Sequence, residues 1–195
     1  MRRNNVTILR AILMSLFVAP CLASAQTLTP KLDLGITFIG DSTNPVNGSN
    51  SWLTGGGLEL GVDAWHGLGI AADVQGLHSS AIGPQNIGVD LVSVTFGPRY
   101  RYTKPTASKL HSVSAFGEAL LGEANAFNSF FPSPAGGITS ANSLALDIGG
   151  GIDLGLSRRV AIRAVQANWL RTQLPNATAN IQNHLQLGAG LVVRF

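Results

Sequence analysis

The chain has 195 residues, of which 23 are Gly and only 12% are charged, against roughly 25% in typical soluble domains. Hydrophobic residues make up 45% of it, yet no apolar run reaches the ~18 residues that a membrane-spanning helix needs. This composition argues against an ordinary water-soluble enzyme, excludes a helical membrane protein, and is too apolar for a disordered chain.

The first 25 residues have the features of a cleaved secretion signal. Three arginines precede an apolar stretch, and the small residues Ala23 and Ala25 occupy the positions that a signal peptidase reads. Cleavage after Ala25 leaves 26–195 as a single domain and lowers the formal charge from +3 to zero. The basic character therefore belongs to the signal, and no basic surface for binding nucleic acid is expected on the domain.

Cys21 is the only cysteine and lies within the predicted signal. The mature domain therefore has no disulfide and no thiolate that serves as ligand or nucleophile. Acylation of Cys21, as in a lipoprotein, is an alternative, but Pro20 differs from the small residue that such processing requires.

A period of two dominates the rest of the chain. From Ser143 to Ser157 apolar residues hold the even positions and mainly small or acidic residues the odd ones, and 184–195 repeats the alternation. Weaker matches lie at 31–39, 53–65, 67–78, 87–102, 109–122 and 159–171. The pattern predicts eight strands, with a β-bulge near Ala164 and Val165, where the phase slips in the seventh strand.

The connections between these strands are expected to alternate in length. Short turns are predicted at His66 and at 157–158, and a slightly longer one at 103–108. Longer loops rich in Asn, Ser, Gly and Pro are predicted near 40–52, 79–86, 123–140 and 172–182. One end of the sheet would then carry long loops and the other short turns.

Two closed eight-stranded arrangements fit this pattern, a soluble barrel with apolar side chains inward and an outer-membrane barrel with apolar side chains outward. The face that alternates Asp with Gly distinguishes them. Exposed Gly weakens a strand without adding solubility, whereas small residues fit the narrow lumen of an eight-stranded barrel. We therefore predict an all-β fold, an eight-stranded antiparallel up-and-down transmembrane β-barrel with its apolar side chains toward lipid.

This register directs charges of both signs into the lumen, where a buried charge must be paired or hydrogen-bonded. The predicted interior charge network comprises Asp63, Arg99, Arg101, Asp153, Arg194, Glu118, Asp147 and Arg163, and Asp33, Glu59 and Asp73 share its face. The members expected within reach of one another near the short turns are Asp63, Asp153, Arg99, Arg101 and Arg194. We interpret the network as a structural plug, with a proton or ion path as the alternative.

Aromatic residues are expected to form two girdles, with Tyr100, Tyr102 and Phe195 near the short turns and Phe38 and Trp169 near the long loops. The signal segment, the eight strands, Gly-Pro-Arg-Tyr-Arg-Tyr at 97–102 and Leu-Gly-Ala-Gly-Leu-Val-Val-Arg-Phe at 187–195 resemble the small OmpA/OmpX-like outer-membrane β-barrel proteins. The resemblance implies a monomer in the bacterial outer membrane with periplasmic termini, in contact with outer-membrane lipid and lipopolysaccharide.

The resemblance also implies recognition by the barrel-assembly machinery through an assembly signal at Leu191, Val193 and Phe195. Members of this family are structural, adhesive or protective and differ in their loops. The predicted function is therefore a structural or surface-interaction role through the loops, with a narrow pore or channel as an alternative.

A lipid A-modifying hydrolase is a further alternative. A lipid A deacylase of this size is similar in using His-x-Ser on one strand and an acid on the next. Here His78, Ser80 and Asp90 would be base, nucleophile and orienting group, although that family has Glu in place of Asp. Ordinary turn composition also explains these three residues, so no catalytic residue is predicted.

No metal site and no cofactor are expected either. His66, His111 and His184 lack the spacing of metal ligands. The triple glycines at 55–57 and 149–151 lie within strands, where they cannot cradle a phosphate at a helix N-terminus, and are attributed to close backbone packing or strand curvature.

Overall fold

The computed structural model describes residues 31–46, 49–82, 87–106, 110, 112–133, 136–175 and 180–195. The predicted secretion signal, Cys21 and His111 lie outside the described residues. No helix in the described part of the chain is long and apolar enough to cross a membrane.

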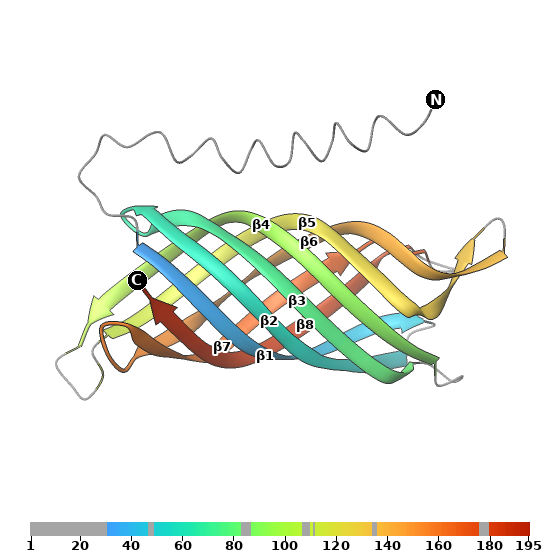
Figure 1. The fold of residues 1–195 in the computed structure, drawn as a ribbon, viewed down its shortest axis with the longest axis horizontal. Coiled ribbons are helices and arrows are strands. Elements are labelled where there is room, and N and C mark those ends of the chain that lie inside the picture. Colours follow the sequence, from blue (N-terminus) through green and yellow to red (C-terminus); the bar gives the residue numbers. More distant parts are fainter. Residues whose placement is uncertain are drawn as a thin grey trace, which may run out of the picture.

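Eight antiparallel strands follow one another around a closed barrel, and β8 pairs with β1 to complete the ring (Figure 1). The fold predicted from the period of two is thereby confirmed. The strands are β1 (Lys31–Val46), β2 (Ser49–Trp65), β3 (Leu68–Ile82), β4 (Ile87–Pro105), β5 (Ser112–Ser133), β6 (Gly136–Gly155), β7 (Val160–Thr172) and β8 (Gln182–Arg194).

Apolar side chains face outward along the middle of the barrel, as predicted. On β6, Ile148 is 44% exposed, whereas its neighbour Asp147 is 1% exposed. The same contrast holds on β4, where Tyr100 is exposed and Arg99 is buried. Because the side-chain period of a strand is two, one phase places the apolar row outside and the charged row in the lumen along each regular stretch of strand.

The predicted β-bulge in β7 is confirmed. Val165 pairs with Ile152 and Arg163 pairs with Asp153, so Ala164 is the additional residue on β7. The pairing with β8 shifts between Arg163 and Gln166 as well. Because of the bulge, Arg163 and Gln166 both point into the lumen although three positions separate them.

The predicted long loops are wrong over most of their length. Most of 123–140 is strand, because β5 and β6 continue as a hairpin to Ser133 and from Gly136. The β1–β2 and β3–β4 hairpins are also longer than predicted, and 173–181 separates two of the described strands at this end more widely than the other connections do. A high content of Asn, Ser and Gly is a poor predictor of loops here. The hydrogen bonds between paired strands join main-chain groups, so these residue types do not prevent a hairpin from continuing.

The turns at the opposite end are short, as predicted. His66 and Gly67 join β2 to β3 with φ angles of 48° and 85°, which suit a tight hairpin turn. We call this end of the barrel the short-turn end, and the end that carries the β5–β6 hairpin the long-strand end.

Candidate functional site

Paired charges fill the lumen at the short-turn end. We call this set of side chains the charged layer, and its members are Asp33, Glu59, Asp63, Arg99, Arg101, Asp153, Arg163 and Arg194. Four arginines face four carboxylates in this layer, so its formal charge is balanced. Such balance matters because an unpaired charge in a narrow lumen costs several kcal/mol, on the order of the stability of a whole domain.

Arg99 is the centre of the charged layer and is 1% exposed. Its Nη2 lies 2.6 Å from Asp33 Oδ2, and its Nη1 lies 3.0 Å from Glu59 Oε1. Asp63 Oδ1 completes the set at 3.0 Å from Nη2. One guanidinium thus connects β4 to three carboxylates on β1 and β2, with the forked geometry that arginine provides.

Arg163 connects the opposite wall to the same cluster. Its Nη1 lies 2.8 Å from Glu59 Oε2, and its Nε lies 3.0 Å from Asp153 Oδ1. The guanidinium carbon stands 4.3 Å from the centroid of the Phe116 ring, which adds a cation–π contact. Glu59 therefore bridges Arg99 and Arg163 across the lumen.

Arg101 and Arg194 complete the layer toward the short turns. Arg101 Nη1 lies 3.0 Å from Asp33 Oδ2, and its Nη2 lies 3.5 Å from Asp153 Oδ2. Arg194 Nη2 is 3.8 Å from Asp153 Oδ2, which is an ion pair beyond hydrogen-bonding distance. The five residues expected to meet near the short turns therefore lie in contact through this cluster.

Glycines provide the space that these large side chains occupy. A Cβ atom at Gly61 would overlap the guanidinium of Arg99, and one at Gly151 would lie 2.9 Å from the Phe116 ring. Glycine on the lumen face is thus a steric requirement at these two positions.

Glu118 and Asp147 face the lumen but take no part in the ion pairs. Asp147 accepts hydrogen bonds from Asn168 Nδ2 at 2.9 Å and from Gln75 Nε2 at 3.3 Å. Glu118 is 6% exposed, and neither of its carboxylate oxygens has a hydrogen-bond partner among the described residues. The predicted network therefore divides into an ion-paired group and these two separate carboxyl groups.

The lumen at the long-strand end is filled by apolar side chains, which the sequence analysis missed. We call this set the apolar layer, and its members are Ile39, Leu53, Leu77, Leu91, Ala124, Ala126, Phe131, Ala141, Ala145, Leu170 and Leu174. The alternation along the strand predicts the inward direction of these residues, because Leu77 lies on the same face of β3 as the inward-facing Asp73 and Gln75. Those positions lie in segments whose sequence predicts loops or strand ends.

Buried polar side chains adjoin the apolar layer, and Asp41 is the charged one among them. Asp41 is fully buried and accepts hydrogen bonds from His184 Nδ1 at 3.1 Å and from Gln186 Nε2 at 3.0 Å. His184 is thus a partner of a carboxylate. Within the described part of the chain no three His, Cys, Asp or Glu side chains are arranged to hold a metal ion.

His78 and Asp90 meet on the outer surface, at the long-strand end of β3 and β4. His78 Nδ1 lies 2.6 Å from Asp90 Oδ1, and Asn128 donates to Asp90 Oδ2. The hydrogen bonds from Asn128 and His78 lower the pKa of Asp90. Ser80 lies two residues further along β3 and is exposed, and no contact joins it to His78 in the described structure.

Comparison with solved structures identifies the class of fold, whereas no protein-family model and no curated protein sequence matches the chain. Neisserial surface protein A aligns with a TM-score of 0.59 at 15% identity, over 84% of this chain and 97% of the other. The Yersinia pestis attachment invasion locus protein Ail, in complex with the heparin analogue sucrose octasulfate, aligns with a TM-score of 0.55 at 17% identity, over 86% and 100%.

These likenesses, together with the closed ring of eight strands and the outward apolar row, define the class. The chain has the fold of the small OmpA/OmpX-like outer-membrane β-barrels. At 15–17% identity the likeness concerns the fold alone.

Proposed function

We propose that the protein is a closed barrel of the bacterial outer membrane, with periplasmic termini, that binds partners at the long-strand end. The outward apolar row supports insertion in a membrane, because large side chains such as Phe38 and Ile70 are 67% and 60% exposed. A folded barrel of this kind resists detergent and migrates differently on a gel before and after boiling. Identical migration of the two samples would contradict the membrane-barrel assignment.

The β5–β6 ribbon, residues 128–140, carries the proposal of a binding role. Pairing of β4 with β5 ends at Phe127, and pairing of β6 with β7 begins at Ala145, so β5 and β6 pair only with each other beyond these positions (Figure 1, yellow and orange). Among the described residues of the ribbon, the backbone groups of both outer edges thus have no strand partner, and they are able to accept an extended peptide as an added strand.

Exposed apolar side chains on the ribbon support the same interpretation. Phe130 is 65% exposed and Ile138 is 39% exposed. The partly exposed Asp90 and the exposed Glu123 lie at the same end, so a polyanion such as the sucrose octasulfate bound to Ail is a poor match. An extended, apolar polypeptide segment is the ligand that fits this chemistry.

A display library of random peptides tests the ribbon directly. The unmodified barrel should enrich extended apolar peptides, whereas a variant in which Asn-Gly replaces 128–140 should enrich none. The Phe130→Ser variant should lose most of the signal, and Ile181→Ser, which changes another exposed apolar residue at the same end, should keep it. Equal enrichment on the shortened barrel would refute binding by the ribbon.

The filled lumen argues against the narrow-pore alternative. Arg99, Arg163 and Asp153 are at most 1% exposed, and the apolar layer lies between them and the long-strand end. Ions meet both a fixed charge cluster and an apolar barrier, so we expect no steady current in planar-bilayer recordings. A stable conductance from the pure barrel would favour the pore.

A lipid A-modifying hydrolase is a second candidate because of one observation, the 2.6 Å contact between His78 Nδ1 and Asp90 Oδ1. In this arrangement Asp90 would orient the ring, and Nε2 would take the proton of Ser80 as its oxygen attacks an ester carbonyl. The ester C–O bond would then break, and Nε2 would return the proton to the departing lipid hydroxyl. Water would then release the fatty acid from the acyl-serine. The site lies where the outward apolar row gives way to polar residues.

Mass spectrometry of extracted lipid A tests this candidate. If the hydrolase proposal holds, expression of the unmodified protein removes an acyl chain, and Ser80→Ala abolishes the change. Ser79→Ala is the matched control, because Ser79 is buried toward the lumen on the same strand. An unchanged lipid A mass in all strains would end the proposal.

We also propose that Leu191, Val193 and Phe195 serve as the assembly signal. All three side chains face outward, and Phe195 is 73% exposed. Phe195→Ala should lower the amount of folded barrel in cells while leaving refolding from urea into detergent unchanged. A parallel loss in both assays would indicate a role in stability instead.

A further inference from the structure

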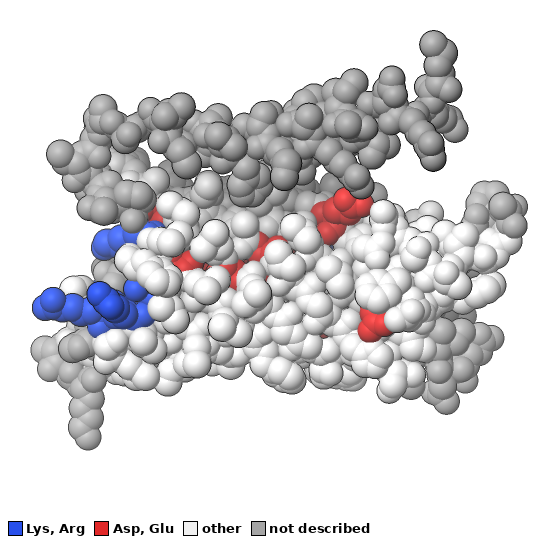
Figure 2. Space-filling view, viewed as in Figure 1, with Lys and Arg blue, Asp and Glu red and all other residues white. Residues whose placement is uncertain are grey.

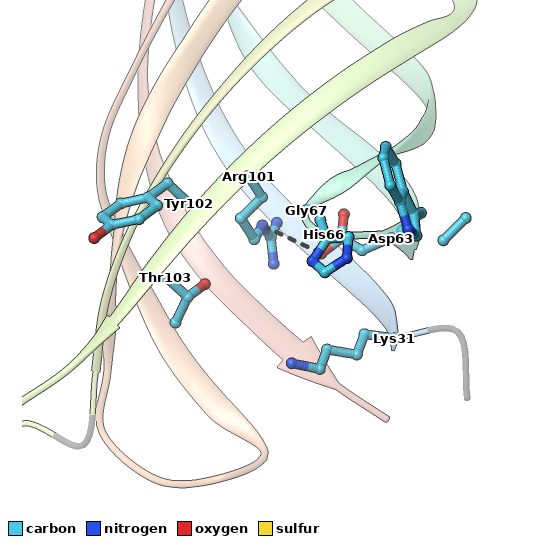
Figure 3. A pocket seen from close by; sticks show the side chains of 9 residues that line it. Lys31, Asp63, His66, Gly67, Arg101, Tyr102 and Thr103 are labelled. Atoms are coloured by element: carbon cyan, nitrogen blue, oxygen red, sulfur yellow. Dashed lines mark ion pairs between the residues drawn. The ribbon is translucent and has the colours of Figure 1, made fainter. Parts of the chain in front are cut away.

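A pocket of about 420 Å³ opens at the short-turn end (Figure 3). The pocket exists because the β2–β3 turn ends before the neighbouring strand β4 along the barrel axis. The β2–β3 turn stops at His66 and Gly67, where Arg101 N donates to Gly67 O at 2.7 Å, whereas β4 continues to Pro105. Tyr102 and Thr103 form one wall of the notch, and Lys31 at the start of β1 stands across from them.

Positive groups dominate the polar lining of this pocket. Lys31 is exposed and forms no ion pair among the described residues. Arg101 is 6% exposed, and its Nε has no hydrogen-bond partner. Asp63 is the acid in the lining and pairs with Arg99 at 3.0 Å, and Arg101 pairs with Asp33 at 3.0 Å, so Lys31 is the positive group of the lining whose charge no described carboxylate offsets. The pocket therefore has the electrostatic character of an anion site.

The surrounding rim is also positive. The exposed Lys and Arg residues of the described chain, namely Lys31, Lys104, Arg158 and Arg159, all belong to the short-turn end. The carboxylates at this end, in contrast, are paired inside the charged layer. Figure 2 shows the resulting blue region at one end of the barrel. Such a rim attracts anions to the mouth of the pocket.

Two aromatic residues connect the pocket with the outer surface. Trp65 and Tyr102 line it and are 62% and 60% exposed on the outward face. Trp and Tyr typically lie at the level of lipid headgroups, where one part of the ring contacts acyl chains and another contacts polar groups. An anion in this pocket would thus sit beside the hydrocarbon boundary, where lipid phosphates are found.

We propose that the pocket binds the phosphate of an anionic phospholipid headgroup. Lys31 supplies the charge, Arg101 an unpartnered Nε–H donor and His66 a further ring nitrogen, while Trp65 and Tyr102 contact the glycerol and acyl portion. The proposal rests on the barrel lying in a membrane, and it is independent of the β5–β6 ribbon and of any hydrolase activity.

Native mass spectrometry of the detergent-refolded full barrel tests the proposal. With phosphatidylglycerol and phosphatidylcholine of identical acyl chains, we expect one phosphatidylglycerol to be retained about tenfold more than phosphatidylcholine, the ratio of one charge-assisted contact. Lys31→Glu should abolish this preference. Arg158→Glu makes the same charge change on the rim outside the pocket and should preserve it. Equal loss in the two variants would overturn the site in favour of diffuse surface charge.

Further measurements distinguish a lipid phosphate from a free phosphate ester, and a failed pocket from a failed barrel assignment. sn-Glycerol 3-phosphate should bind far more weakly than the lipid, and equal binding would overturn the headgroup assignment. His66→Asn, which tolerates the φ of 48° at this turn, should weaken retention without affecting folding. A variant that loses the gel shift between unboiled and boiled samples would contradict the barrel itself, whereas a folded barrel without lipid preference would refute only the pocket.

Discussion

The two ends of the lumen are filled by different chemistry. In the charged layer Arg99 and Arg163 are at most 1% exposed, and in the apolar layer Leu53 and Leu170 are at most 2% exposed. Both layers exclude water, but ion pairs need defined distances and directions, whereas apolar contacts need only matching volume. The charged layer therefore fixes how distant strands align, and the apolar layer seals the remaining space.

The largest expected effect is the loss of the guanidinium at the centre of the charged layer. Arg99→Met leaves Asp33, Glu59 and Asp63 in the lumen with too little positive charge. We expect the free energy of unfolding to fall by about 3–5 kcal/mol, measured by urea titration of the gel-shifted band in detergent.

A second substitution tests whether charge causes that loss. Adding Asp33→Asn to Arg99→Met removes one of the uncompensated carboxylates, so part of the lost stability should return. Arg99→Lys should be intermediate, because an ammonium restores the charge but not the fork that reaches both Asp33 and Glu59. If the double variant is no more stable than Arg99→Met, volume rather than charge explains the effect.

The apolar layer should tolerate substitution better. Leu170→Ala removes a fully buried side chain and leaves a cavity, which we expect to cost about 2–4 kcal/mol in the same urea titration. Leu170→Met keeps most of the volume and should cost less than about 1.5 kcal/mol. A loss for Leu170→Met as large as that for Arg99→Met would contradict the distinction between the two layers.

The sequence predicted which charged side chains point into the lumen better than it predicted which of them form ion pairs. Parity along each strand is local, so the inward direction of Arg99, Asp63 and Asp153 followed from alternation alone. The contacts of Arg163 with Glu59 and of Arg99 with Asp33 join residues 104 and 66 positions apart. Such contacts depend on how strands are staggered around the closed ring, which no single strand encodes.

The apolar layer and the lengths of the strands show that residue composition is a weak predictor of where a strand ends. Composition identified 123–140 as a loop because Asn, Ser and Gly are frequent there, yet Ala124 and Ala126 continue the inward row of β5. A polar outer row and small inner residues are compatible with a hairpin that has left the lipid-facing region. The alternation that is typical of a strand thus continues in β5 beyond the point where its outward side chains stop being apolar.

The smallest expected effect concerns Asp41, the buried carboxylate beside the apolar layer. Asp41→Asn keeps the shape of the side chain but replaces the carboxylate that accepts from His184 and Gln186. We expect a loss of about 1 kcal/mol, measured by urea titration of the unboiled band, because the hydrogen bonds from His184 and Gln186 lose their charged acceptor. The double variant Asp41→Asn with His184→Gln should then cost less than the sum of the two single changes, since both remove the same contact. Strict additivity would show that Asp41 and His184 are independent, and the apolar layer would then hold two separate polar groups, each stabilised by its own neighbours.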